Sequence, residues 1–211
     1  MKLNTIAEKL KFIRKKSDLS IEQWSRLLLM SDSTITSVEG SKRKPSLDYI
    51  HRVVNLFFHS LGDDSRRFMF TDHLLHWFCN PEQSLDDDAL LIIGTVRLRP
   101  IQKSSLYGQV SFDTTYVGNA IRFVRKQLLD VSADKLFANR KPYTFRNIHN
   151  YERGLYKPNW ETIAHICRES RSYGLAFRCI LGMEEPEMYS GFITRPSGTV
   201  EQKLSRIFVR N

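Results

Sequence analysis

The feature that most constrains the fold of this chain is a partial repeat of its own sequence. The segment VEGSKRKPS, Val38–Ser46, returns 113 residues later as YERGLYKPN, Tyr151–Asn159, with a glutamate, a lysine and a proline at the same spacings. Upstream, Leu10–Trp24 resembles Ile121–Leu136 at an offset that starts at 111 residues and reaches 113 after two turns. Because the offset changes only at turns, the matched helices keep their register, which is how a duplicated helical unit would diverge.

The first copy is predicted to contain four or five short helices. Apolar residues at spacings of three and four indicate an amphipathic first helix. Ser20 and Ser31 are good N-cap residues, and Gln23 completes a capping box with the first of them. The expected helices cover Ile6–Ile13, a segment from Ser20 to about Leu28, Asp32–Glu39 and Leu47–Phe58.

The second copy is predicted to repeat this order, with N-caps at Ser132 and Thr144 and with Asn159 ahead of the last helix. Its expected helices cover about Asn119–Leu129, Ser132 to about Asn139, Phe145–Arg153 and Trp160 to about Ser170. Between the copies, Gly62–Asn80 predicts a further apolar helix. Leu90–Pro100 stays open between helix and strand, because its Ile and Val residues favour a strand that has no evident partner.

The charge of the chain is unevenly distributed. The net charge is +9, and residues 1–60 carry 11 basic and 6 acidic residues, whereas residues 61–115 carry 5 and 8. Residues 116–180 carry 12 basic and 5 acidic residues, and the last 31 are balanced at 4 and 4. Basic surfaces attract nucleic acids because neutralised phosphates release their condensed counterions. Two basic copies around an acidic centre therefore favour nucleic acid as the partner.

The sequence favours a protein of a reducing compartment. Its three cysteines, Cys79, Cys167 and Cys179, are odd in number and far apart, unlike a disulfide framework. The longest apolar runs fall far short of the roughly 20 residues that span a bilayer. The first residues alternate charged and apolar side chains, unlike a secretory signal. We therefore expect a cytoplasmic protein that does not contact membranes.

Two clusters raise the question of metal chemistry. His73 and His76 could share a helix face near Cys79, but they lie among Phe and Trp residues typical of a packing helix. The acidic run Asp86–Asp88 is explained by a helix cap or a solvated segment, because consecutive acids seldom converge on one ion. We therefore expect no metal, no cofactor and no catalytic residue, and no small-molecule ligand is evident.

In each copy, two short helices joined by a tight turn, the second polar on its outer side, form a helix-turn-helix arrangement. These residues resemble the Cro/phage-repressor (XRE-type) helix-turn-helix family. The first copy matches the family pattern at Leu10, Arg14, Leu19, Ser20, Leu28, Ser31, Ser33–Thr36, Glu39, Pro45–Leu47 and Ile50. The second copy matches it at Ile121, Arg125, Ser132, Leu136, Ile148, Tyr151–Gly154, Pro158, Ile163 and Ala164. Together the matches cover about half of the chain.

Both copies depart from the family pattern near the turn. The turn glycine of the family is replaced by Leu29 in the first copy. The small residue of the second helix becomes Ser25 there and Phe137 in the second copy, whose turn also has one extra residue. The family glycine that follows the recognition helix falls at Ser41, one place after Gly40.

The resemblance implies that the second helix of each pair lies in the major groove, with nearby amides and basic side chains on phosphates. Arg pairs bidentately with guanine and Asn with adenine, whereas short hydroxyls read bases weakly. The implied DNA contacts of the first copy are Ser33, Thr34, Thr36, Ser37, Lys42, Arg43 and Lys44. Those of the second copy are Arg146, Asn147, His149, Asn150, Arg153, Tyr156 and Lys157.

Glu39 and Glu152 have a structural role in this interpretation. The resemblance implies that they form ion pairs with Arg14 and Arg125, in the first helix of each copy. Such pairs hold helices together and involve no catalytic proton, so the protein is not expected to be an enzyme.

The sequence therefore predicts a mainly α protein with two lambda-repressor-like helix-turn-helix domains of four to five helices each. We expect these domains at residues 1–60 and 116–180, a partly helical connecting region at 61–115, and a tail at 181–211 with a short amphipathic segment. The expected function is sequence-specific transcriptional regulation, with repression favoured over activation. The expected partner is double-stranded DNA, an operator with two or more half-sites in the nucleoid, bound by a single chain or a homodimer.

Alternatives to this function stay open. In the first, only one copy binds DNA, and the other, in particular the first with its Ser/Thr helix, is a protein-interaction or dimerisation module. Such a chain would be antitoxin-like or an accessory factor. In the second, the chain is an enzyme such as a nuclease that binds a metal through Asp86–Asp88. RNA recognition is also open, although no sheet with stacking aromatic residues is visible.

Overall fold

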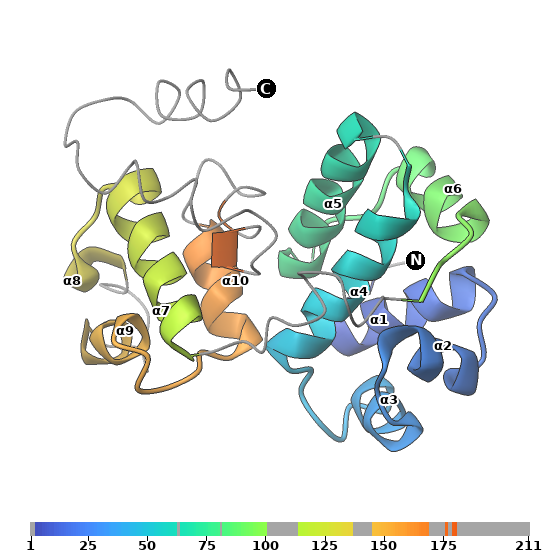
Figure 1. The fold of residues 1–211 in the computed structure, drawn as a ribbon, viewed down its shortest axis with the longest axis horizontal. Helices are drawn as coiled ribbons and strands as arrows, with labels where there is room; N and C mark the ends of the chain where they lie inside the picture. The colour runs from blue at the N-terminus through green and yellow to red at the C-terminus, as the bar shows by residue number, and fades with distance from the viewer. Residues whose placement is uncertain are drawn as a thin grey trace. The chain divides into compact units, whose positions relative to one another are not determined.

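Every regular element among the described residues of the computed structural model is a helix (Figure 1). The structure describes residues 3–62, 64–80, 82–100, 114–136 and 145–168, together with Ala176, Cys179 and Ile180. Across these residues the prediction of a mainly α protein is confirmed. The chain divides into two units, Met1–Gln109 (unit 1) and Val110–Asn211 (unit 2).

Unit 1 is built from short helices around one apolar core. Its helices are α1 (Ile6–Lys16), α2 (Ile21–Leu28), α3 (Asp32–Glu39), α4 (Leu47–Ser60), α5 (Asp64–Cys79) and α6 (Asp87–Thr95). Leu10, Trp24, Ile35 and Phe57 are completely buried in this core. The helix α4 contacts both α2 and α5, so it is buried around most of its circumference.

The helix starts of unit 1 follow from its capping residues. Ser20 Oγ accepts from the Gln23 N–H at 3.1 Å, and Gln23 Oε1 accepts from the Ser20 N–H at 2.8 Å. The side chains of Ser31 and Ser46 cap α3 and α4 by accepting from the N–H groups of Thr34 and Tyr49. Each cap satisfies N–H groups that the first helical turn leaves without an intrahelical partner. The predicted capping box therefore forms, and α2 and α3 have the predicted bounds.

Most of the expected connecting region belongs to unit 1. The helix α5 packs on α4, and the Lys9 ammonium of α1, only 1% exposed, donates to the carbonyls of Trp77 and Asn80 at the end of α5. Burial lowers the pKa of Lys9 to about 8. The segment that was open between helix and strand is helical to Thr95, and Asp86 caps that helix.

Unit 2 repeats the order of the first four helices of unit 1. Its elements are α7 (Thr114–Phe123), a π-helical turn η1 (Val124–Leu129), α8 (Ala133–Leu136), α9 (Phe145–Glu152) and α10 (Trp160–Arg168). The first of them begins at Thr114, about one turn earlier than predicted. Thr144, Phe137 and the amphipathic segment of the tail lie outside the described residues.

The π-helical turn accounts for the first change in the repeat offset. Arg14 and Arg125 are 111 residues apart, but Asp18 and Asp130, with left-handed φ values of 54° and 52°, are 112 apart. Hydrogen bonds in a π turn span five residues, so the turn holds one residue more than an α turn. The Asp130 N–H donates to the Arg125 carbonyl in this way. The extra residue therefore lies within the helix, and the expectation that it lies in a turn was wrong.

Candidate nucleic-acid interface

A buried ion pair joins the first helical element of each unit to its third helix. In unit 1, Arg14 Nε and Nη2 donate to the two carboxylate oxygens of Glu39 at 2.7 and 2.6 Å. In unit 2, Arg125 Nε and Nη2 donate to those of Glu152 at 2.5 and 3.0 Å. All four side chains are at most 9% exposed. Both pairs that the resemblance implies are therefore present, and the hydrogen bond that Arg14 donates to Glu39 raises the pKa of Arg14.

The same arginines also fix the loop that leads into the second helix. Arg14 Nη1 donates to the Leu19 carbonyl at 2.7 Å, and Arg125 Nη1 donates to the Val131 carbonyl at 2.8 Å. These carbonyls directly precede Ser20 and Ser132, where the second helix of each unit begins. Arg14 thus connects α1 with the start of α2 and with α3. Arg125 connects η1 with the start of α8 and with α9.

The exits of α3 and α9 share one backbone conformation. Ser41 has φ 57° and Gly154 has φ 69°, both in the left-handed region. The Ser41 N–H donates to the Val38 carbonyl, and the Gly154 N–H donates to the Tyr151 carbonyl, both at 2.9 Å. The left-handed exit residue of unit 1 is therefore Ser41, one place after Gly40. A serine thus occupies a position at which glycine is strongly favoured.

The chain then enters the fourth helix in the same way in both units. Pro45 and Pro158 are buried. The side chain of Ser46 caps α4, and Asn159 Oδ1 accepts from the Thr162 N–H at 2.8 Å to begin α10. The segments that follow α3 and α9 are therefore held by equivalent contacts.

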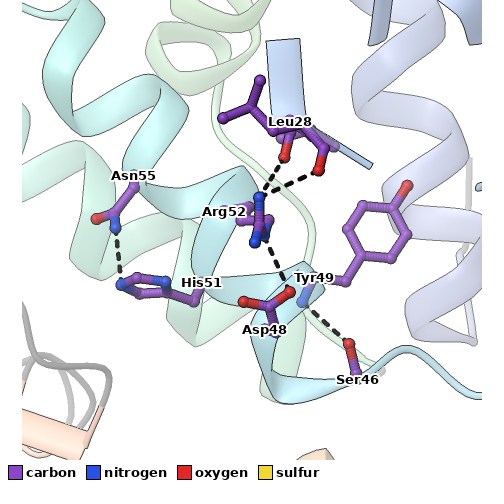
Figure 2. A network of polar contacts seen from close by, with 8 residues as sticks. Leu28, Ser46, Asp48, Tyr49, His51, Arg52 and Asn55 are labelled. Carbon is purple, nitrogen blue, oxygen red and sulfur yellow. Dashed lines mark hydrogen bonds and ion pairs between the residues drawn. The ribbon is translucent and has the colours of Figure 1, made fainter. Parts of the chain in front are cut away.

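Arg52 of α4 holds the end of α2, just ahead of α3 (Figure 2). Its Nη1 donates to the Leu28 carbonyl at 2.8 Å and to the Leu29 carbonyl at 3.3 Å, while Nε donates to Asp48 at 2.9 Å. Leu29 has φ 53° and is 42% exposed, so a leucine occupies a helix C-cap where glycine is the usual residue. The contact with Arg52 stabilises this turn.

His165 of α10 occupies the position of Arg52 in unit 2, 113 residues later. Its Nε2 lies 3.1 Å from the carbonyl oxygen of Leu136, the last residue of α8. In both units, one side chain of the fourth helix therefore binds the carboxyl end of the second helix.

The predicted base-contacting residues lie at equivalent, equally exposed positions on α3 and α9. Each helix has two exposed and two half-buried polar side chains on its outer side, whereas Ile35 and Ile148 are completely buried on the inner side. The exposed pairs are Ser33/Arg146 and Thr36/His149, and the half-buried pairs are Thr34/Asn147 and Ser37/Asn150. The members of each pair are 113 residues apart, so the two scaffolds present the same four positions.

The predicted phosphate-contacting residues follow these helices. All three residues of Lys42–Lys44 are exposed, as are Arg153 and Lys157, and Tyr156 is 62% exposed. Leu155, 55% exposed, was not predicted to be part of this surface. An apolar residue directly after a turn glycine, in an otherwise polar loop, is the signal that would have indicated it.

The histidine and acidic clusters do not combine into a metal site. Among the described residues, no group of three or more His, Cys, Asp or Glu side chains is placed to hold a metal ion. His73 Nδ1 lies 3.1 Å from a carboxylate oxygen of Asp86 at the surface, whereas Cys79 is buried. Asp86 instead has the helix-capping role that its sequence context suggested.

No protein-family model matches this sequence, and no curated protein or solved structure shows a significant match. Within the described part of the chain, no helix combines the length and the apolar character that crossing a membrane requires. Function is therefore inferred from the geometry of the two units themselves.

Proposed function

We propose that this protein is a sequence-specific DNA-binding transcriptional regulator with two lambda-repressor-like, XRE-type helix-turn-helix domains. One observation carries this proposal: α3 and α9 are held by the same set of contacts in both units. The set consists of the buried Arg–Glu pair, the left-handed exit residue and the capped helix after a buried proline. Between these anchors, each helix presents four polar side chains outward.

The shape and charge of these surfaces suit duplex DNA. The major groove of B-DNA, about 12 Å wide, admits one α-helix, and its base edges carry donors and acceptors that Arg and Asn side chains match. Exposed cations directly after each helix are placed to neutralise phosphates beside the groove. The net charge of +9 favours the same partner.

The covalent link between two readers has consequences for the target. Helix-turn-helix proteins usually reach two half-sites one helical turn, about 34–36 Å, apart by forming dimers. A chain with two units has the means to span two such sites alone, or more as a homodimer, and the link raises the effective concentration of the second unit. The proposed role is repression at an operator in the nucleoid, by binding without catalysis.

The test uses the full-length protein and a pool of duplexes of random sequence. Repeated selection should yield a site bound at least about 10³-fold more tightly than random duplex at physiological salt. Binding to random duplex should weaken linearly with salt concentration on a double logarithmic scale. If no duplex binds with such salt dependence, the proposal is wrong.

Arg146→Ala tests direct readout in this system. The variant should weaken binding to the selected site by about 1–3 kcal/mol and leave binding to random duplex nearly unchanged. Arg97→Ala, which removes an exposed arginine beyond α6, is the charge-matched control and should change both affinities equally. Equal losses on both DNAs with Arg146→Ala would contradict direct readout by α9.

A further inference from the structure

The two candidate recognition helices share their anchoring contacts and differ in the side chains that they present. The pairs Ser33/Arg146 and Thr36/His149 have the same exposure and follow the same anchoring contacts. A difference in what the two helices bind must therefore come from the side chains themselves. If the chain binds DNA as proposed above, these side chains decide which unit reads the bases.

The outer face of α3 is poorly suited to reading bases. It carries only hydroxyl side chains, each of which pairs with several bases and makes no bidentate contact. Ser31 Oγ lies 3.1 Å from Ser33 Oγ and 2.8 Å from Thr34 Oγ1, so these hydroxyls already hydrogen-bond to one another at the helix start. Asp32, the exposed first residue of α3, adds a carboxylate that repels phosphates.

The outer face of α9 is well suited to reading bases. Arg146 can donate two hydrogen bonds to guanine, and Asn147 and Asn150 can each make the paired contacts that identify adenine. His149 adds ring nitrogens at a position that is exposed in both units. A single bidentate pair discriminates against the wrong base by about fivefold to 150-fold.

The loops after the two helices show the opposite distribution. Unit 1 has three consecutive exposed cations in Lys42–Lys44. The equivalent residues of unit 2, 113 positions later, are Leu155, Tyr156 and Lys157, so the loop after α9 has two exposed cations, Arg153 and Lys157, and these are not consecutive. Phosphate contacts supply affinity without sequence information, because every base pair carries the same backbone.

We infer that the two units divide the work of DNA binding. Unit 2 reads the base sequence through α9, and unit 1 supplies sequence-independent affinity through Lys42–Lys44. The target therefore contains one specified block of base pairs beside duplex of unspecified sequence. This inference rests on the proposed function.

Selection of duplexes by the wild-type protein is the first test. The selected sequences should share one continuous block of specified base pairs. With one chain bound per duplex, as measured by the mass of the complex, two blocks separated by about one helical turn would overturn the inference while leaving the proposed function intact. Salt-dependent binding without any selected block would overturn it as well, because α9 would then not read bases.

Variants of unit 1 test whether it supplies sequence-independent affinity. K42Q/R43Q/K44Q should weaken binding to selected and random duplexes by the same factor, about tenfold or more, and lower the salt slope by up to about 2.7, or 0.9 for each phosphate contact. K15Q/K16Q, which removes two exposed cations at the end of α1, is the control and should change affinity by less than about twofold. Unchanged affinity and slope in the triple variant would overturn the inference, because unit 1 would then not be on DNA.

Two kinds of variant test which helix reads bases: one removes the side chains of α9, and the other places those side chains on α3. R146A/N150A should weaken binding to the selected block by about tenfold or more without weakening binding to random duplex. S33A/T36A should leave the selected sequence unchanged, and a shifted sequence would count against the inference. Because the two scaffolds are equivalent, S33R/T34N/T36H/S37N should add a second specified block. If no duplex binds the wild-type protein at all, the proposed function itself fails.

Discussion

In unit 2 the first helix passes α9 at a glycine, whereas the corresponding residue of unit 1 is an alanine. Ala7 and Gly118 occupy the same place in the repeat, 111 residues apart. A Cβ atom on Gly118 would lie 2.3 Å from the Tyr151 carbonyl oxygen, so α7 and α9 approach each other too closely for any side chain there. The Arg–Glu pair is nevertheless present in both units. The polar anchor is thus shared, while the apolar contact around it has adapted to different residues.

The largest expected effect comes from breaking the shared anchor. Glu39→Ala and Glu152→Ala each leave a buried arginine without its carboxylate, which typically costs about 3–5 kcal/mol of unfolding free energy. Amide hydrogen exchange should show that the loss is confined to the unit that carries the change. Glu22→Ala, which breaks an exposed pair with Arg26, should cost less than about 1 kcal/mol. A loss shared equally by both units would contradict the independence of the two anchors.

Acid should weaken unit 1 through a histidine that unit 2 lacks. His51 is 3% exposed, and burial, followed by the positive charges of Arg52 and His59, lowers its pKa to about 3. The unfolded chain binds the proton near its usual pKa of about 6.5, so stability is lost as the pH falls from 6.5 toward 3. The loss between pH 7 and pH 4 should be about 3 kcal/mol. The equivalent residue of unit 2 is Ala164.

Urea unfolding at pH 7 and pH 4 measures this effect as a difference between variants, because other groups also titrate in that range. His51→Gln should lose about 3 kcal/mol less than the wild type between the two pH values. His149→Gln, an exposed histidine on α9, should behave like the wild type. Equal pH dependence of all three proteins would show that His51 is not the sensitive group.

Because α7 and α9 lie so close together, exchanging glycine and alanine at this position should change the stability of the two units by different amounts. Gly118→Ala should destabilise unit 2 by about 1–3 kcal/mol, because the added methyl group meets backbone atoms that must move. Ala7→Gly should cost unit 1 about 1 kcal/mol, chiefly through helix propensity. Thermal unfolding of the two variants measures both changes. A stabilised Gly118→Ala variant would show that α7 and α9 are farther apart than in this structure.

The smallest expected effects come from exchanging the two exit residues. Ser41→Gly should stabilise unit 1 by up to about 1 kcal/mol, because glycine adopts a positive φ at no steric cost. Gly154→Ser should destabilise unit 2 by a similar amount. Gly40→Ala, at a negative φ one residue earlier, is the local control for the first change and should not stabilise unit 1. Unfolding midpoints in urea are precise enough to rank these variants.

Features that depend on local chemistry were predictable from the sequence. The caps at Ser20 and Ser31 depend on residues only three positions apart, so the starts of α2 and α3 could be placed. The ion pairs Arg14–Glu39 and Arg125–Glu152 were implied by the resemblance to the helix-turn-helix family, and both are present. The outward positions of α3 and α9 follow from helical periodicity once those helices are placed.

Features that depend on contacts between distant segments were not predictable. Residues 61–115 were expected to connect the two copies because they lie between them, but the buried Lys9 binds carbonyls at the end of α5, about 70 residues away. The role of Arg52 depends on a backbone carbonyl, which no residue pattern reveals. The close approach at Gly118 likewise follows from the positions of two helices, and an isolated glycine gives no indication of its neighbour.

The π-helical turn at Val124–Leu129 bears on how such a chain tolerates insertion. One codon added inside an α-helix normally rotates every later residue by about 100°, which would carry Asp130 and the next helix away from their partners. Here the wider π turn accommodates the added residue before Asp130. Asp130 therefore keeps the left-handed conformation that Asp18 has in unit 1. The two copies can therefore differ in length at this point while Arg125 keeps both of its partners.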